Sequence, residues 1–202
     1  MATAGEMKAL KKRLINALLY GPVQVVSYSY NGIRINHADF KRVATAISKN
    51  AVHVIVGNVP PDAAAMYVVS GDGENTFFVP KMSYGSVNHE KASIAHEAVH
   101  CILDIRKTVV PAITTEVMAY ITTGILHMYF AISPRQGKDN LRDDVFMAAN
   151  KVASIVVDEK RRALDATMPE LQELAAAIQN HPNYSMTLGS TFSWGEDGVE
   201  GA

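Results

Sequence analysis

The order of the elements along this chain predicts an α+β fold. Runs rich in β-branched and aromatic residues occur within roughly the first 80 positions, and long stretches with helical periodicity follow. The chain has 202 residues, 48% of them hydrophobic, which suffices for a core without disulfides. We therefore expect a small N-terminal mixed or antiparallel sheet packed on a C-terminal helical half. A single domain is expected over residues 1–185.

The N-terminal part alternates between predicted helix and predicted hairpin. Glu6–Tyr20 carries apolar residues at helical spacing. Val23–Tyr30 and Ile33–Asn36 are β-rich runs joined by Asn31-Gly32, the dipeptide that best tolerates a tight hairpin turn. His37–Lys49 returns to helical spacing. The sequence therefore predicts helix, hairpin and helix in that order.

The middle of the chain predicts a strand and a second hairpin, after which helices dominate. Ala51–Val56 is a β-branched run. Met66–Val69 and Thr76–Val79 flank a glycine-rich turn at residues 71–74, which is typical of a hairpin. Helical periodicity then predicts four further helices, which are Asn88–Arg106, Thr114–Phe130, Asn140–Ala166 and Pro169–Asn180.

Charge and cysteine content limit the classes of function. Nineteen Lys and Arg balance 20 Asp and Glu, for a net charge of −1, so we expect no general binding to nucleic acid or to an anionic membrane. We see no targeting or membrane-spanning segment, and the single cysteine, Cys101, cannot form an intramolecular disulfide. A cytoplasmic protein is expected, with delivery as an effector left open. Residues 186–202 are rich in glycine and acidic residues and are expected to form a mobile tail or one docked by its aromatic rings.

One motif in the sequence indicates a specific chemical function. His96, Glu97 and His100 form an HExxH pattern inside a predicted helix. Spacing of i, i+4 places the two imidazoles on one face about 6 Å apart, close enough to share a tetrahedral Zn²⁺, with Glu97 beside them. Ser93 and Asp104 extend this polar stripe on an otherwise apolar helix. The alternative is a solvated stripe on a surface helix, which usually carries Lys, Glu and Gln instead.

A catalytic zinc needs a third protein ligand. Asp104 lies about 12 Å along the helix from His96, so it suits a supporting hydrogen bond better than a shared ion. Glu116 begins the next predicted helix, which returns past the first and brings this carboxylate back to the histidines. Its alternative role is to complement the positive end of that helix.

The segments HEAVHCILD and TTEVMAY resemble the core of the zincin metallopeptidases, specifically the gluzincin type, over roughly residues 75–130. The resemblance implies Zn²⁺ bound by His96, His100 and Glu116, with Glu97 as general base in the hydrolysis of a peptide or protein substrate. It also implies that the substrate pairs with an edge strand, either Met66–Ser70 or Thr76–Pro80. The third histidine of the metzincins is absent, since Arg106 stands at that position.

Stabilisation of the developing oxyanion needs a hydrogen-bond donor. Tyr120 is the first candidate, because it shares one helical face with Glu116, Thr123 and His127. Its alternative role is a half-buried ring bonded to a backbone carbonyl. His127 lies about 16 Å beyond Glu116 and reaches the metal only if the helix bends or ends early. Two non-enzymatic alternatives are a zinc-binding module without turnover and a metal-free helical interaction protein.

Overall fold

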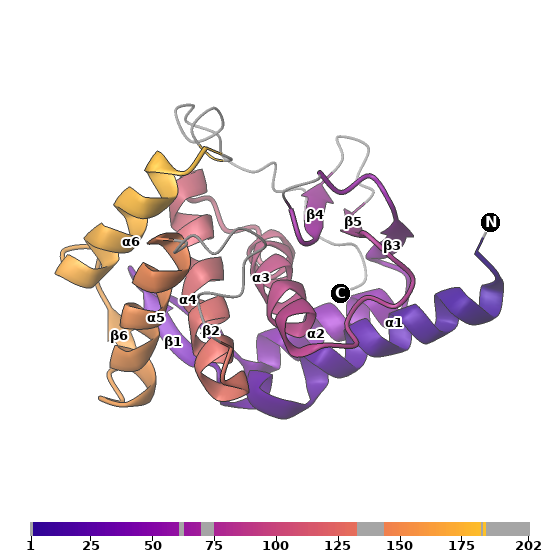
Figure 1. The fold of residues 1–202 in the computed structure, drawn as a ribbon, viewed down its shortest axis with the longest axis horizontal. Helices are drawn as coiled ribbons and strands as arrows, with labels where there is room; N and C mark the ends of the chain where they lie inside the picture. The colour runs from indigo at the N-terminus through magenta and orange to yellow at the C-terminus, as the bar shows by residue number, and fades with distance from the viewer. Residues whose placement is uncertain (1, 61–62, 70–74, 133–143, 183, 185–202) are drawn as a thin grey trace.

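The computed structural model describes residues 2–60, 63–69, 75–132, 144–182 and 184. Its elements are α1 (Ala4–Leu19), the 3₁₀ helix η1 (Gly21–Val25), β1 (Ser27–Tyr30), β2 (Ile33–Asn36), α2 (His37–Ser48), β3 (His53–Val56), β4 (Met66–Val69), β5 (Asn75–Val79), α3 (Asn88–Ile105), α4 (Ala112–Phe130), α5 (Asp144–Val157), β6 (Ala163–Leu164) and α6 (Pro169–Asn180). The predicted α+β class is confirmed, and helices make up the C-terminal half (Figure 1).

The strands form two small mixed sheets instead of one. The first has the order β2-β1-β6, with β1 antiparallel to β2 and parallel to β6. The second has the order β3-β5-β4, with β5 parallel to β3 and antiparallel to β4. Both predicted hairpins are therefore present, and Asn31 and Gly32 both adopt the positive φ of a tight turn. The turn at residues 71–74 lies outside the described residues.

Two predicted elements were wrong in part. The strand predicted from Val23 begins only at Ser27, because Gly21 has a φ of 77° and Pro22 then starts the short helix η1. The helix predicted over Asn140–Ala166 ends at Val157, and part of its remainder forms β6 beside β1. Residues 140–143 and the predicted tail over 186–202 lie outside the described residues.

Helix α3 occupies the middle of the molecule (Figure 1). The β3-β5-β4 sheet lies on one side of it and α4 on the other, with α5 and α6 beyond α4. Helices α4 and α5 approach closely at Gly124, where an added Cβ would lie 2.5 Å from the carbonyl oxygen of Ala149. The core runs through both halves, so α3 is enclosed by packed apolar side chains.

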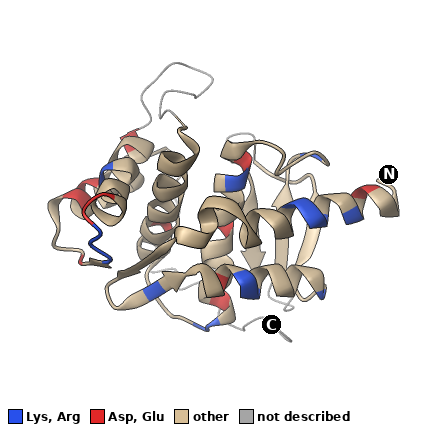
Figure 2. Cartoon of the chain, turned by 90° about the horizontal axis from the view of Figure 1, so that it is seen from below, with Lys and Arg blue, Asp and Glu red and all other residues tan. Residues whose placement is uncertain are grey.

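Charged residues of both signs occur in both halves of the described chain (Figure 2). Within the described residues, no helix is long and apolar enough to cross a membrane.

Candidate metal centre

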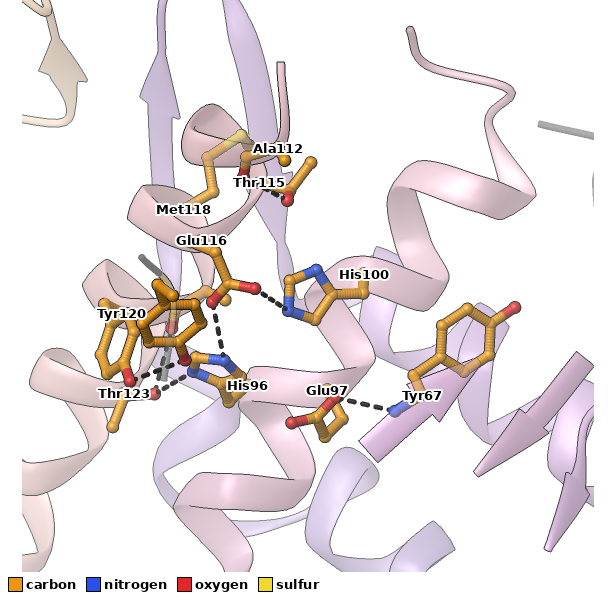
Figure 3. A network of polar contacts seen from close by, with 12 residues as sticks. Tyr67, His96, Glu97, His100, Ala112, Thr115, Glu116, Met118, Tyr120 and Thr123 are labelled. Atoms are coloured by element: carbon orange, nitrogen blue, oxygen red, sulfur yellow. Dashed lines mark hydrogen bonds and ion pairs between the residues drawn. The ribbon is translucent and has the colours of Figure 1, made fainter. Parts of the chain in front are cut away.

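Antiparallel packing of α3 and α4 brings the three predicted ligands together. Glu116 on α4 lies between His96 and His100 on α3 (Figure 3). The Nε2 atoms of His96 and His100 each lie 3.5 Å from a different carboxylate oxygen of Glu116. One ligand atom from each residue lies within 4.8 Å of the others, the one such group among the described residues. The structure thus brings together the residues that the sequence predicted.

Burial rules out two of the simpler interpretations. The side chains of His96, His100 and Glu116 are 12%, 7% and 11% exposed, so the stripe on α3 does not face solvent. Helix α4 begins at Ala112, earlier than predicted, which places Glu116 beyond its first turn. Complementing the helix end therefore does not explain why a carboxylate is buried here.

The ring of His96 is oriented by α4. Its Nδ1 lies 3.1 Å from the hydroxyl of Thr123, and that hydroxyl donates to the backbone carbonyl of Ala119. Because the Thr123 hydroxyl donates its single proton to the Ala119 carbonyl, it accepts a hydrogen bond from the Nδ1–H group of His96. Nε2 faces Glu116 (Figure 3), and in the neutral imidazole it is the nitrogen that carries the lone pair.

The protonation states of two predicted ligands suit metal binding. Burial lowers the pKa of His100 to about 4, which keeps this imidazole neutral near pH 7. Burial alone would raise the pKa of Glu116, but the neighbouring His100 and His96 outweigh it and lower that pKa. For His96, burial is outweighed by the hydrogen bond and charge of Glu116, and the pKa is raised. A metal cation would displace this proton.

Glu97 lies between His96 and Tyr67 of the β4 strand (Figure 3). Its carboxylate accepts a hydrogen bond of 2.8 Å from the backbone amide of Tyr67. Burial is the main reason that the pKa of Glu97 rises to about 7, and the Tyr67 amide and His96 only partly oppose it. Glu97 can therefore both take up and release a proton near neutral pH.

Tyr67 was not identified from the sequence. Besides its amide bond to Glu97, its hydroxyl donates to Asp104 at 2.6 Å. Asp104 is thus a supporting residue on α3, and its partner is a side chain of the sheet. Nothing in the local pattern of a short β-rich run indicates which strand meets the HExxH helix.

The structure distinguishes the two strands proposed for substrate binding. β5 (Asn75–Val79) lies between β3 and β4, so both of its edges are occupied. β4 (Met66–Val69) lies at the edge of its sheet, and the amide of Tyr67 faces Glu97 instead of β5. A small pocket opens beside this strand, lined by Tyr67, Val69, His100, Leu103, Asp104, Thr108 and Thr115.

Tyr120 lies at the ligand cluster, in contact with His96. Its ring meets that imidazole edge-on, with the centroids 4.7 Å apart. Its hydroxyl lies 3.0 Å from the hydroxyl of Tyr184, which follows α6. Tyr184 also makes a small contribution to the lowered pKa of Glu116. No motif marks Tyr184, because it is 68 positions from Glu116 in a segment without periodicity.

His127 and Cys101 are separate from the ligand cluster. Helix α4 continues to Phe130, and the His127 ring packs on Phe146 at 5.2 Å between centroids. Cys101 is a free, buried thiol whose pKa is raised by burial. Buried thiols of this kind are unreactive.

Comparisons with models of known protein families, with curated proteins and with solved structures found no match to this chain. Its fold and buried residues define an α+β protein with a candidate centre of two histidines and a glutamate.

Proposed function

We propose that this protein is a zinc-dependent metallopeptidase. The observation that supports the proposal is the convergence of His96, His100 and Glu116 next to Glu97, a partly buried carboxyl group with a pKa of about 7. A purely structural zinc site usually fills all four positions with protein ligands and needs no adjacent base. Two histidines and one carboxylate would leave the fourth position of a tetrahedral zinc open.

The residues fit a zinc ion. Bonds of about 2.0–2.1 Å in a tetrahedral arrangement place ligand atoms about 3.4 Å apart. The two distances from a histidine nitrogen to a glutamate oxygen are both 3.5 Å, and one ligand atom from each of the three residues lies within 4.8 Å of the others. Nitrogen and carboxylate oxygen are also ligands that zinc prefers.

When bound, zinc supplies a Lewis acid for the scissile carbonyl and lowers the pKa of a water molecule. Glu97 takes the proton of the attacking water and later delivers it to the leaving amine. The amide of Tyr67 keeps the Glu97 carboxylate at the β4 side of the cluster during both transfers. Tyr120 stays the first candidate for the oxyanion donor, since its ring contacts His96.

The proposed substrate is an extended peptide. The outer edge of β4 offers backbone groups next to Glu97, and an extended segment can add to such an edge as a further strand. We place the activity in the cytoplasm, because the only cysteine is free and buried.

Metal content and hydrolysis test this function together. Protein purified without a metal-affinity tag is expected to contain about one zinc per chain, and Glu116→Ala to contain clearly less. The matched control is Glu173→Ala, which removes an exposed glutamate of α6 and should leave zinc unchanged. Glu97→Gln should retain zinc but lose hydrolysis of a peptide library. Wild-type protein that binds no zinc after repletion would overturn the proposal, and so would a fully active Glu97→Gln variant.

A further inference from the structure

Tyr67 of β4 is hydrogen-bonded to helix α3 at two points. Its backbone amide donates to the Glu97 carboxylate at 2.8 Å, and its hydroxyl donates to the Asp104 carboxylate at 2.6 Å. Glu97 and Asp104 are seven residues apart, so they lie on one face of α3, about 10 Å from each other along its axis. One residue of the edge strand thus bridges two turns of the helix that carries the HExxH motif.

The register between β4 and β5 explains why the Tyr67 amide can reach Glu97. Tyr67 lies opposite Phe77, and Val68 lies opposite Thr76. In an antiparallel pair, hydrogen-bonded and non-hydrogen-bonded positions alternate. Because the Tyr67 amide points out of the sheet, the amide of Val68 is the one directed to β5. The distance between the Tyr67 amide and Glu97 therefore depends on how β4 lies on α3.

The side chain of Tyr67 holds β4 on α3. Its ring is buried and packs on Phe77, with the centroids 6.2 Å apart. Its hydroxyl reaches Asp104, a buried carboxylate two turns after Glu97. Hydrogen bonds to an ionised carboxylate are stronger than those between neutral groups. Loss of this bond would allow the four-residue strand to shift and would weaken the contact of its amide with Glu97.

We propose that Asp104 and the Tyr67 hydroxyl are positioning residues for Glu97. The bond between them keeps β4 in place on α3, so that the Tyr67 amide stays within hydrogen-bond distance of the Glu97 carboxylate. Both groups act through that amide and not on the reacting atoms. The catalytic side of this inference rests on the function proposed above, in which Glu97 is the base.

Amide hydrogen exchange of the metal-free protein, followed residue by residue by NMR, tests the positioning without reference to zinc or activity. In Tyr67→Phe, the amide of residue 67 should exchange at least about 10-fold faster, because the lost bond is to a charged group. The amide of Val68 should keep its protection, since it faces β5. Tyr28→Phe is the matched control. It removes a buried hydroxyl that donates to the Met118 carbonyl and should leave exchange at residue 67 unchanged.

Two variants of Asp104 separate the hydrogen bond from the bulk of the side chain. Asp104→Asn keeps an oxygen that accepts from Tyr67, so exchange at residue 67 should stay close to that of the wild type. Asp104→Leu removes the acceptor and should match Tyr67→Phe. In the zinc-loaded protein, kcat for a library peptide should follow the same order, with a fall of up to about 100-fold where the bond is lost.

Unchanged exchange at residue 67 in Tyr67→Phe would overturn this inference alone. Equal losses of protection at residue 67 and at Val68 would also overturn it, because they would show that the Tyr67 hydroxyl only stabilises the sheet. An unchanged kcat in a variant whose residue 67 exchanges faster would do the same. A wild type without zinc or hydrolysis would overturn the function proposed above, and the exchange experiment would still decide whether Asp104 positions the Tyr67 amide.

Discussion

Helix α3 carries two inward-facing glutamates with opposite environments. Glu90, near its start, accepts hydrogen bonds from the backbone amides of Ser86 and Val87 and pairs with Lys81 at 2.7 Å. Burial acts to raise the pKa of Glu90, but Lys81 and the amides outweigh it, so the pKa is lowered. Glu97, two turns later, accepts one bond from a backbone amide within the described chain, and burial raises its pKa to about 7.

These different surroundings indicate that Glu90 is a structural carboxylate and Glu97 a reactive one. Glu90 is compensated by a cation and by two amides at the helix start, so it stays ionised and stabilises that end of α3. Glu97 is partly buried, and its charge is only partly compensated, which costs stability and is typical of functional sites. Removing the charge of Glu90 should therefore lower the stability of the fold near neutral pH, and removing the charge of Glu97 should raise it.

The largest expected effect is on catalysis. Glu97→Gln should lower kcat by roughly 10²- to 10⁴-fold, because it removes the proton acceptor while preserving the shape of the side chain. Glu90→Gln should retain most of the wild-type kcat at a temperature where it is fully folded. Peptide hydrolysis by the two variants, at equal zinc content, measures the contrast. Equal losses in both would show that the two glutamates do not differ in this way.

Zinc should stabilise the folded protein by binding at His96, His100 and Glu116 only. At a free zinc concentration one hundred times the Kd, the folded state gains about 2.7 kcal/mol, seen as a higher Tm. Glu90→Gln should show the same zinc-dependent rise in Tm, since its side chain lies outside the ligand group. Glu116→Ala should show little or none. A rise that survives Glu116→Ala would place the stabilising zinc elsewhere.

In the metal-free protein, Glu97→Gln should be stabilising at neutral and alkaline pH. The pKa of Glu97 rises on folding from 4.5 to about 7, so the stability of the wild type falls as the pH increases through that interval. An uncharged glutamine avoids this loss, which is on the order of 2 kcal/mol above pH 7. Urea unfolding of chelator-treated protein between pH 4 and pH 8 tests this. A Glu97→Gln variant less stable than wild type at pH 8 would contradict it.

The smallest effect is expected at Glu90. Its lowered pKa means that its contribution is present above the unfolded value near 4.5 and disappears as the pH falls through the folded value. Glu90→Gln should therefore cost about 1 kcal/mol at pH 7, through weaker bonds to Lys81 and the amides. Thermal melts should show this deficit shrinking toward acid pH. A deficit that grows on acidification would be inconsistent with a lowered pKa.

Local pattern predicted most of the elements but not their pairing. The Asn31-Gly32 turn and the periodicity of α3 and α4 indicate those elements by themselves. The short strand β6 could not be recognised, because Ala163–Leu164 is stabilised by pairing with β1 and not by its own composition. Similarly, two separate sheets instead of one depend on which apolar faces meet in the core.

The candidate site was predictable where one helix or one helix pair determines it. The spacing of His96 and His100 is local, and the turn after α3 returns Glu116 to them. Tyr67 and Tyr184 come from β4 and from the segment after α6, and their contacts depend on tertiary packing alone. Supporting residues of this kind carry no motif, so only the folded chain reveals them.

The pairing of β1 with β6 has a consequence for the order of folding. The Asn31 side chain accepts a hydrogen bond from the amide of Ala166, 135 positions further on. The first sheet therefore stays incomplete until most of the chain has left the ribosome, although its hairpin can form early. Closing so long a loop is slow, so a nascent chain would hold the HExxH helix before its surroundings are assembled. Zinc capture during synthesis is accordingly expected to be a late event.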